Sequence, residues 1–198
     1  MSYDPDIHHR RSIRLDHYDY SQEGYYFITL CVQNRACLFG EIAEDKMALN
    51  PAGKMIHKNW NELPKRFLNL KMDECVVMPN HFHGIVKLNQ IKPVQHLDKL
   101  KPSGTLEHSI GRIFQAFKSI TTHEYIQGVK QNHWPSFSGK LWQRNYWEHV
   151  ITNEYELYFI REYISHNPEK WASDGLFSDN KLQSPQGRIQ DSPLRLSC

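Results

Sequence analysis

The chain has 198 residues, of which 39% are hydrophobic and 23% charged, which suits one globular domain with a core. The net charge is only +2, which excludes the strong overall field of a histone-like protein, so any nucleic-acid surface must be local. No apolar run approaches transmembrane length, the amino terminus lacks a signal-peptide core, and the four cysteines form no CxxC pair. We therefore expect a soluble cytoplasmic protein with reduced thiols.

The first half of the chain predicts an arm, a strand, a hairpin and a helix. Residues 1–20 are polar and irregular and read as a basic amino-terminal arm. Residues 25–35 are aromatic and β-branched, which favours a central strand, and residues 37–50 hold two apolar patches around an acidic turn, which favours a small hairpin. Asn50, followed by proline, predicts the start of a helix whose apolar spacing continues to Pro64, with a glycine near its start as a mild flaw.

The middle of the chain predicts two neighbouring strands, a helix and a third strand. Residues 71–78 and 81–88 are two strands broken by a Pro-Asn turn, close enough to pair. Residues 90–108 hold two prolines, a glycine and three lysines, and predict a surface loop insertion. Helical spacing resumes over 109–129, and residues 141–151 favour a strand of mixed aromatic and polar residues.

A last helix and a polar tail complete the chain. Asn153, with a glutamate three residues later, predicts a capping box, and Pro168 ends the helix that follows. Residues 172–198 are rich in Ser, Asp, Gln and Pro and predict a loose carboxy-terminal tail. The element order predicts an α+β fold for the domain 21–171: a ferredoxin-like split βαβ antiparallel sheet with helices on one face and an extra C-terminal helix.

Two histidines lie one residue apart in a predicted strand. Because side chains alternate along a strand, His81 and His83 share a face, where two imidazoles can chelate a divalent metal. The alternative is that they are hydrogen-bonded polar residues on a partly exposed strand. A histidine-triad hydrolase would need a third histidine at Ile85, and an amidohydrolase barrel would need a longer chain. A structural zinc site would need four ligands, and Cys75 is the only cysteine close by in sequence.

The predicted last helix carries a second candidate group. Tyr163 and Asn167 are four residues apart and so share a helix face, with His166 beside them. A phenol and an amide oxygen can thus face one target. The alternative is that Tyr163 packs with its apolar neighbours and that Asn167 merely ends the helix before Pro168.

The motifs "MPNHFHG", "WQRNYWEHVI" and "YISHNP" occur in this order, and together the chain resembles the REP-associated tyrosine transposases, single-tyrosine HUH nucleases of bacteria. The resemblance runs from about residue 8 to about Trp171. It implies that His81 and His83 bind Mg²⁺ or Mn²⁺, that Tyr163 is the nucleophile, carried by the extra C-terminal helix, and that Asn167 is the third ligand, a role for which His166 could compete.

The resemblance further implies a metal-dependent endonuclease and strand transferase acting on single-stranded DNA hairpins, as a monomer or a homodimer. A divalent cation would help the phenol attack a phosphate, giving a 5′-phosphotyrosine and a free 3′-OH. One alternative is a non-catalytic hairpin-binding protein descended from a transposase, and another is a metal phosphodiesterase that uses water.

Basic and aromatic side chains supply candidate DNA contacts. Phosphate contacts are expected from Arg10, Arg11, Arg14, Lys118 and Arg144. Stacking faces are expected from Trp142, Tyr146 and Trp147, of which we expect only one tryptophan to be exposed. The alternatives are a solvated basic surface and half-buried core aromatics.

Overall fold

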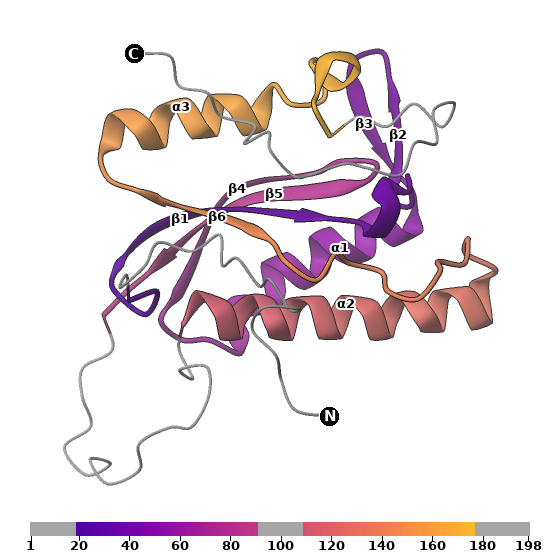
Figure 1. Ribbon diagram of the computed structural model, residues 1–198, viewed down its shortest axis with the longest axis horizontal. Coiled ribbons are helices and arrows are strands. Elements are labelled where there is room, and N and C mark those ends of the chain that lie inside the picture. Colours follow the sequence, from indigo (N-terminus) through magenta and orange to yellow (C-terminus); the bar gives the residue numbers. More distant parts are fainter. Residues whose placement is uncertain (1–18, 91–108, 177–198) are drawn as a thin grey trace, which may run out of the picture.

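The computed structural model describes residues 19–90 and 109–176, which form a four-stranded antiparallel sheet with helices on both faces (Figure 1). In spatial order the strands are β4 (Leu70–Val77), β5 (His81–Leu88), β1 (Gly24–Cys31) and β6 (Trp147–Ile151). This arrangement confirms the predicted α+β class with its split βαβ sheet. The first and third strands of this sheet lie at its centre, as expected.

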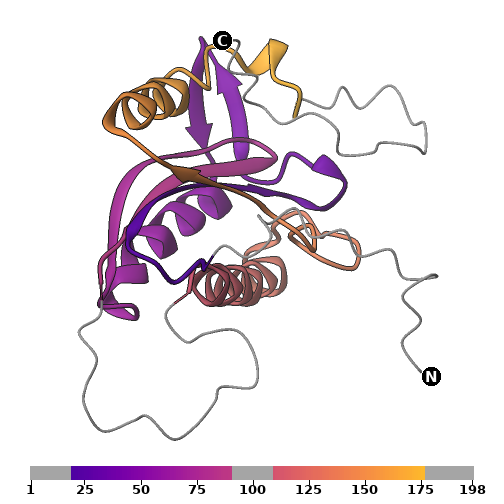
Figure 2. The same cartoon turned by 60° about the vertical axis from the view of Figure 1, so that its left-hand side comes forward.

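The helices divide between the two faces of the sheet (Figures 1 and 2). Helices α1 (Pro51–Glu62) and α2 (Ile110–Asn132) cover one face, and α3 (Glu154–Ser165) lies over the other. A large aromatic core fills the space under α1 and α2, and a smaller apolar cluster lies under α3. Short 3₁₀ helices follow β1, α1 and α3: η1 (Gln33–Arg35), η2 (Leu63–Lys65) and η3 (Trp171–Ser173).

Local capping explains where the helices begin. The Asn50 side chain accepts from the Gly53 N–H at 2.9 Å, and the Asn153 side chain accepts from the Glu156 N–H at 2.8 Å. Gly53 is no flaw in α1, because a Cβ at this position would collide with the carbonyl oxygen of Phe39. Because glycine has no side chain, α1 can pack directly against the backbone at Phe39.

The predicted hairpin is confirmed as β2 (Gly40–Ala43) and β3 (Lys46–Leu49). Its two turn residues, Glu44 and Asp45, both have left-handed backbone angles, with φ of 51° and 58°. Two successive residues with positive φ form the turn whose twist matches a two-residue hairpin.

The strand expected over 141–151 begins only at Trp147. Trp142 is 3% exposed and its indole N–H donates to Thr121 Oγ1 at 2.9 Å, inside the core. The Lys118 ammonium donates to the carbonyls of the next two residues, at 2.5 and 3.0 Å. The backbone of Gln143 donates to Cys31, and that of Gln33 donates to Leu141, so residues 141–143 still pair with the end of β1 as an isolated bridge. The expected strand is therefore interrupted between Trp142 and Trp147.

The strand expected over 25–35 ends at Cys31, where the backbone changes direction. Asn34 and Arg35 have φ of 59° and 53°, which no strand accommodates. The chain turns there, and the Arg35 carbonyl becomes available to other segments of the molecule.

The chain beyond the last helix returns to the sheet. Residues 171–176 pack across the end of β5, although a loose tail was expected from 172. Tyr20, placed in the arm from the sequence, is buried, and its carbonyl accepts from the Ile110 N–H. The rest of the arm with Arg10, Arg11 and Arg14, nearly all of the 90–108 insertion and residues 177–198 lie outside the described residues, and the domain bounds stay predictions. Within the described chain, every helix is too short or too polar to cross a bilayer.

Candidate metal centre and tyrosine site

The histidine pair lies at the start of the central strand β5, on the face covered by α3. His81 and His83 are both 0% exposed, with ring centroids 4.6 Å apart. On the opposite face, Gly84 leaves room for the Trp60 ring, which a Cβ would approach to 2.6 Å. The pair is therefore buried, so the alternative of a partly exposed polar strand does not describe this structure.

The hydrogen bonds of Asn80 determine which nitrogen of His81 carries its proton. The Asn80 Nδ2 group donates to the Leu176 carbonyl at 2.8 Å and to the Arg35 carbonyl at 3.3 Å. Its Oδ1 must then be the acceptor in the 2.8 Å contact with His81 Nδ1, which therefore donates. The lone pair of His81 is left on Nε2, as a metal ligand requires.

His83 is held in a similar way by the neighbouring strand. Its Nδ1 lies 2.8 Å from Thr29 Oγ1, and its Nε2 lies 3.4 Å from the Tyr163 hydroxyl. The tautomer that suits a metal ligand is the one in which Nδ1–H donates to Thr29 and Nε2, on the side of the phenol, carries the lone pair. The two imidazoles thus present converging nitrogens, each oriented by an oxygen behind it.

Helix α3 places Tyr163 against the histidines. The helix buries Leu157, Ile160 and Ile164 against the sheet, and the Tyr163 ring contacts His83 with ring centroids 5.4 Å apart. An ion pair fastens the same helix to β4, because Arg161 makes two hydrogen bonds to Asp73, at 2.6 and 2.8 Å. The phenol therefore reaches the histidines from within one chain.

The two candidates for a third ligand separate clearly. Asn167 is 2% exposed and lies close enough to His81 and Tyr163 to influence the pKa of both. His166 is exposed, and its Nδ1 lies 2.8 Å from the Glu162 carbonyl of its own helix. Asn167 is thus inside the site and His166 points away from it.

A further carboxylate, missed in the sequence, completes the cluster. Asp174 Oδ2 lies 3.6 Å from His81 Nε2, and ligand atoms of His81, His83 and Asp174 all lie within 4.8 Å of one another. The Leu176 N–H donates to the other oxygen of Asp174 at 2.8 Å, and Arg35 holds the Gly175 carbonyl at 2.9 Å. No spacing relates Asp174 to the histidines, so the only available signal was an acid soon after the tyrosine helix.

Three acceptors of this cluster suit a cation. His81 Nε2, Asn167 Oδ1 and Asp174 Oδ2 are buried and make no hydrogen bond of ordinary length. Buried polar atoms are almost always paired, so three such atoms converging on one place is unusual. Imidazole nitrogen together with carboxylate or amide oxygen is a donor set for a divalent cation.

Burial sets the charge state of the site. Desolvation lowers the pKa of His81 to about 3, against an opposing contact from Asn167, and it lowers the pKa of His83 well below its usual range. Desolvation likewise raises the pKa of Asp174, and it raises the pKa of Tyr163 far above that of a free phenol. At neutral pH both imidazoles are neutral and can donate lone pairs, while the tyrosine stays protonated.

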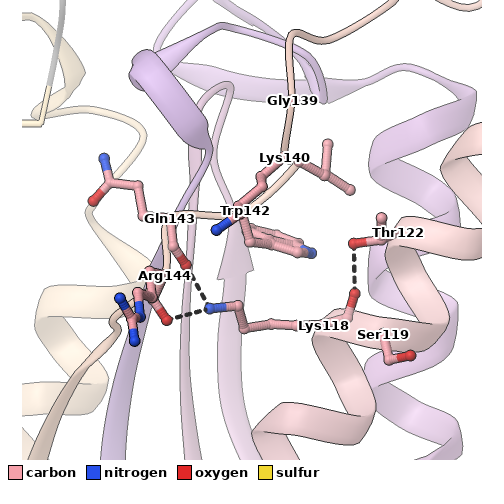
Figure 3. A pocket seen from close by; sticks show the side chains of 9 residues that line it. Lys118, Ser119, Thr122, Gly139, Lys140, Trp142, Gln143 and Arg144 are labelled. Atoms are coloured by element: carbon pink, nitrogen blue, oxygen red, sulfur yellow. Dashed lines mark hydrogen bonds between the residues drawn. The ribbon is translucent and has the colours of Figure 1, made fainter. Parts of the chain in front are cut away.

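The predicted DNA contacts fall into different environments. Trp142 is buried, so it presents no stacking face in this structure. Tyr146 packs against Phe114 in the core, with ring centroids 5.6 Å apart. Lys118 holds backbone carbonyls at the edge of a pocket of about 330 Å³ (Figure 3). Arg144, at the rim of the same pocket, is exposed.

The chain combines a split βαβ sheet with a buried histidine pair under the helix that carries Tyr163. No family model matches the chain. It is 41% identical over 183 residues to an uncharacterized protein of Haemophilus influenzae. The matched region covers 89% of this chain and 98% of that protein. The chain therefore belongs to the same family as that protein.

Solved structures support the fold. The structure of a REP-associated tyrosine transposase bound to a REP hairpin matches with a TM-score of 0.53 and 19% identity, over 91% of this chain and all of that one. A candidate transposase from Deinococcus radiodurans matches at a TM-score of 0.43 and 16% identity, over 78% of this chain and 96% of that one, too weakly to carry an argument. At these identities the likeness shows the fold alone.

Proposed function

We propose that the protein is a metal-dependent nuclease and strand transferase that nicks and rejoins single-stranded hairpin DNA through Tyr163. The observation that carries this proposal is the convergence of a phenol, two neutral imidazoles and two oxygen donors in one buried site. The fold shared with a transposase that was solved with a REP hairpin supports DNA of that kind as the substrate.

In the proposed reaction, the Tyr163 oxygen attacks a DNA phosphate and the bond from phosphorus to the 3′ oxygen breaks. The products are a 5′-phosphotyrosine and a 3′-OH, which takes up a proton in place of the one lost by the phenol. Because the ester conserves the phosphodiester bond, rejoining is the reverse step and needs no nucleotide cofactor. A bound Mg²⁺ or Mn²⁺ would supply the charge that stabilises the phenolate and the phosphate.

His81 and His83 would hold the cation, with Asn167 and Asp174 as oxygen ligands. Both imidazoles are neutral, and the lone pair of His81 lies on Nε2. The Tyr163 phenol, whose pKa is raised by burial, is protonated without a cation, so its activation depends on charge brought into the site. This dependence favours a reaction that requires a metal.

DNA contacts on the exposed surface complete the proposal. Arg144 is available to a phosphate, and Lys140 of the same pocket adds a second cation, whereas Lys118 is already engaged with carbonyls. Tyr146, which packs in part on the core, is a weaker candidate for stacking. The arm residues Arg10, Arg11 and Arg14 stay predictions.

The test is formation of a covalent adduct. Wild-type protein is incubated with Mn²⁺ and labelled single-stranded hairpins taken from the flanks of its own gene, and denaturing gels are examined for a labelled protein. Tyr163→Phe should form no adduct. Tyr158→Phe, at an exposed position of the same helix, is the matched control and should form as much as wild type.

A non-catalytic hairpin-binding protein is the competing function. It predicts binding that is unchanged by EDTA and by Ala at both histidines, with no adduct under any condition. Absence of adduct from wild-type protein with every native hairpin would therefore reject the nuclease and favour this alternative.

A further inference from the structure

The α3-side face of the sheet holds an aromatic pair next to the metal centre. Trp147 and His149 lie two residues apart on β6 and so share a face, and their rings are stacked with centroids 5.6 Å apart and planes 4° from parallel. Both side chains are only partly buried. The two rings thus form a parallel aromatic stack that is partly open to solvent.

The strand register places this surface beside the histidines. Thr29 of β1 pairs with His83 on one side and with Trp147 on the other. His83 and Trp147 are therefore two strand spacings apart, about 10 Å. They lie in the same row and on the same face of the sheet.

Phe27 connects the aromatic pair to the nucleophile. Its ring makes edge contacts with both Trp147, at 5.5 Å between centroids, and Tyr163, at 6.1 Å. The centroids of the Trp147 and Tyr163 rings are thus separated by at most the sum of these two distances. A single strand of DNA with a phosphate at Tyr163 would have a neighbouring base within reach of Trp147.

The charge around the pair permits nucleic acid. An acid beside it, Glu156, contacts His149 and also accepts from the Thr152 N–H and hydroxyl. Both oxygens of this carboxylate are therefore engaged in hydrogen bonds. Flat aromatic faces bind unpaired bases of any sequence, because every base has a π-face.

We propose that Trp147, stacked on His149, is the binding site for an unpaired base next to the phosphate that Tyr163 attacks. This inference rests on the proposed function and assigns one subsite to its substrate. It also identifies which tryptophan of the "WQRNYW" segment faces DNA, since Trp142 is buried on the other side of the sheet.

The test measures binding in the Tyr163→Phe protein without metal, so that it does not depend on cleavage. The probes are fluorescein-labelled oligothymidylate and an abasic oligomer of the same length. Trp147→Ala should weaken oligothymidylate binding about 5- to 150-fold and leave binding of the abasic oligomer unchanged. Trp147→Phe should keep most of the preference for bases.

Two controls make the result decisive. Tyr158→Ala removes an exposed aromatic ring elsewhere on α3 and should change neither affinity. Trp147→Leu retains an apolar contact with Phe27, so it replaces the alanine variant if that variant does not fold. Equal binding of the two probes by the parent protein would overturn the assignment. So would a preference for bases that survives both Trp147→Ala and Trp147→Leu, even if adduct formation by Tyr163 is observed.

Discussion

Asn80 is expected to control metal affinity although it is not itself a ligand. It is 1% exposed, and its amide joins three segments: the His81 ring, the Arg35 carbonyl and the Leu176 carbonyl. Replacing Asn80 by Ala removes the acceptor that keeps the proton on Nδ1 of His81. It also releases the turn that carries Asp174, so it affects two ligands at once.

The size of the effect follows from these contacts. Loss of a group that orients a metal-binding histidine typically costs 10- to 100-fold in affinity, or about 1.4 to 2.7 kcal/mol. The three hydrogen bonds lost contribute about 1 kcal/mol each to folding, so Asn80→Ala should also lower the free energy of unfolding by about 2 to 3 kcal/mol.

Asn80→Asp separates the two roles of this residue. An aspartate still accepts from His81 Nδ1 but cannot donate to the carbonyls of Arg35 and Leu176. If orientation of the ring dominates, this variant should bind Mn²⁺ nearly as well as wild type. If placement of Asp174 dominates, it should bind as poorly as Asn80→Ala.

The assay is Mn²⁺ titration, followed by calorimetry or by the loss of free-ion EPR signal, together with urea unfolding. Asn59→Ala is the matched control, because Asn59 is a buried asparagine that bonds to Met55 and Glu124 on the other side of the sheet. It should cost stability without changing Mn²⁺ affinity. Unchanged affinity in Asn80→Ala, alongside lost affinity in His81→Ala, would refute the reasoning.

Three further substitutions test the surroundings of the site. Asp174→Asn should weaken Mn²⁺ binding by roughly tenfold or more and Asn167→Ala by less, because a carboxylate is the stronger ligand; the reverse order by calorimetry would exclude Asp174 as a ligand. Hydrogen bonds from Arg161 hold the pKa of Asp73 below its usual value. Because the pair is partly solvated, they stabilise the fold by only about 1 kcal/mol. This stabilisation is present above the ordinary carboxyl pKa and is lost as the pH falls through the lowered pKa of Asp73. Urea unfolding should show this loss in wild type and not in Asp73→Asn. Lys118→Met should free the carbonyls that the ammonium holds and lower the free energy of unfolding by about 1 to 2 kcal/mol, with Mn²⁺ affinity unchanged; a large fall in affinity would mean that this segment supports the metal centre.

Features set by neighbouring residues were predictable from the sequence. Asn50 and Asn153 begin their helices by capping a backbone N–H three residues on, a rule that needs no tertiary information. Alternation along a strand was enough to put His81 and His83 on one face. The end of α3 at Ser165, shortly before Pro168, likewise follows from local stereochemistry.

Features set by distant contacts were not predictable in this way. Asp174 reaches His81 only because Arg35 and Asn80 hold the turn that carries it, and these residues are far apart in the chain. The expected strand is interrupted before Trp147, where the carbonyls of Gln143 and Arg144 accept from Lys118 on another element. Periodicity in the sequence contains no information about such partners.

The two faces of the sheet differ in their energetic roles. The face under α1 and α2 buries large aromatic rings such as Trp60, Phe114 and Phe117, each worth several kcal/mol. The other face contains buried acceptors that make no ordinary hydrogen bond, each of which costs about 1 to 3 kcal/mol. A fold can retain such atoms only when apolar burial elsewhere offsets their cost. Since a divalent cation would turn the same atoms into ligands, the unpaired acceptors are a physical argument for a metal that does not depend on any likeness to other proteins.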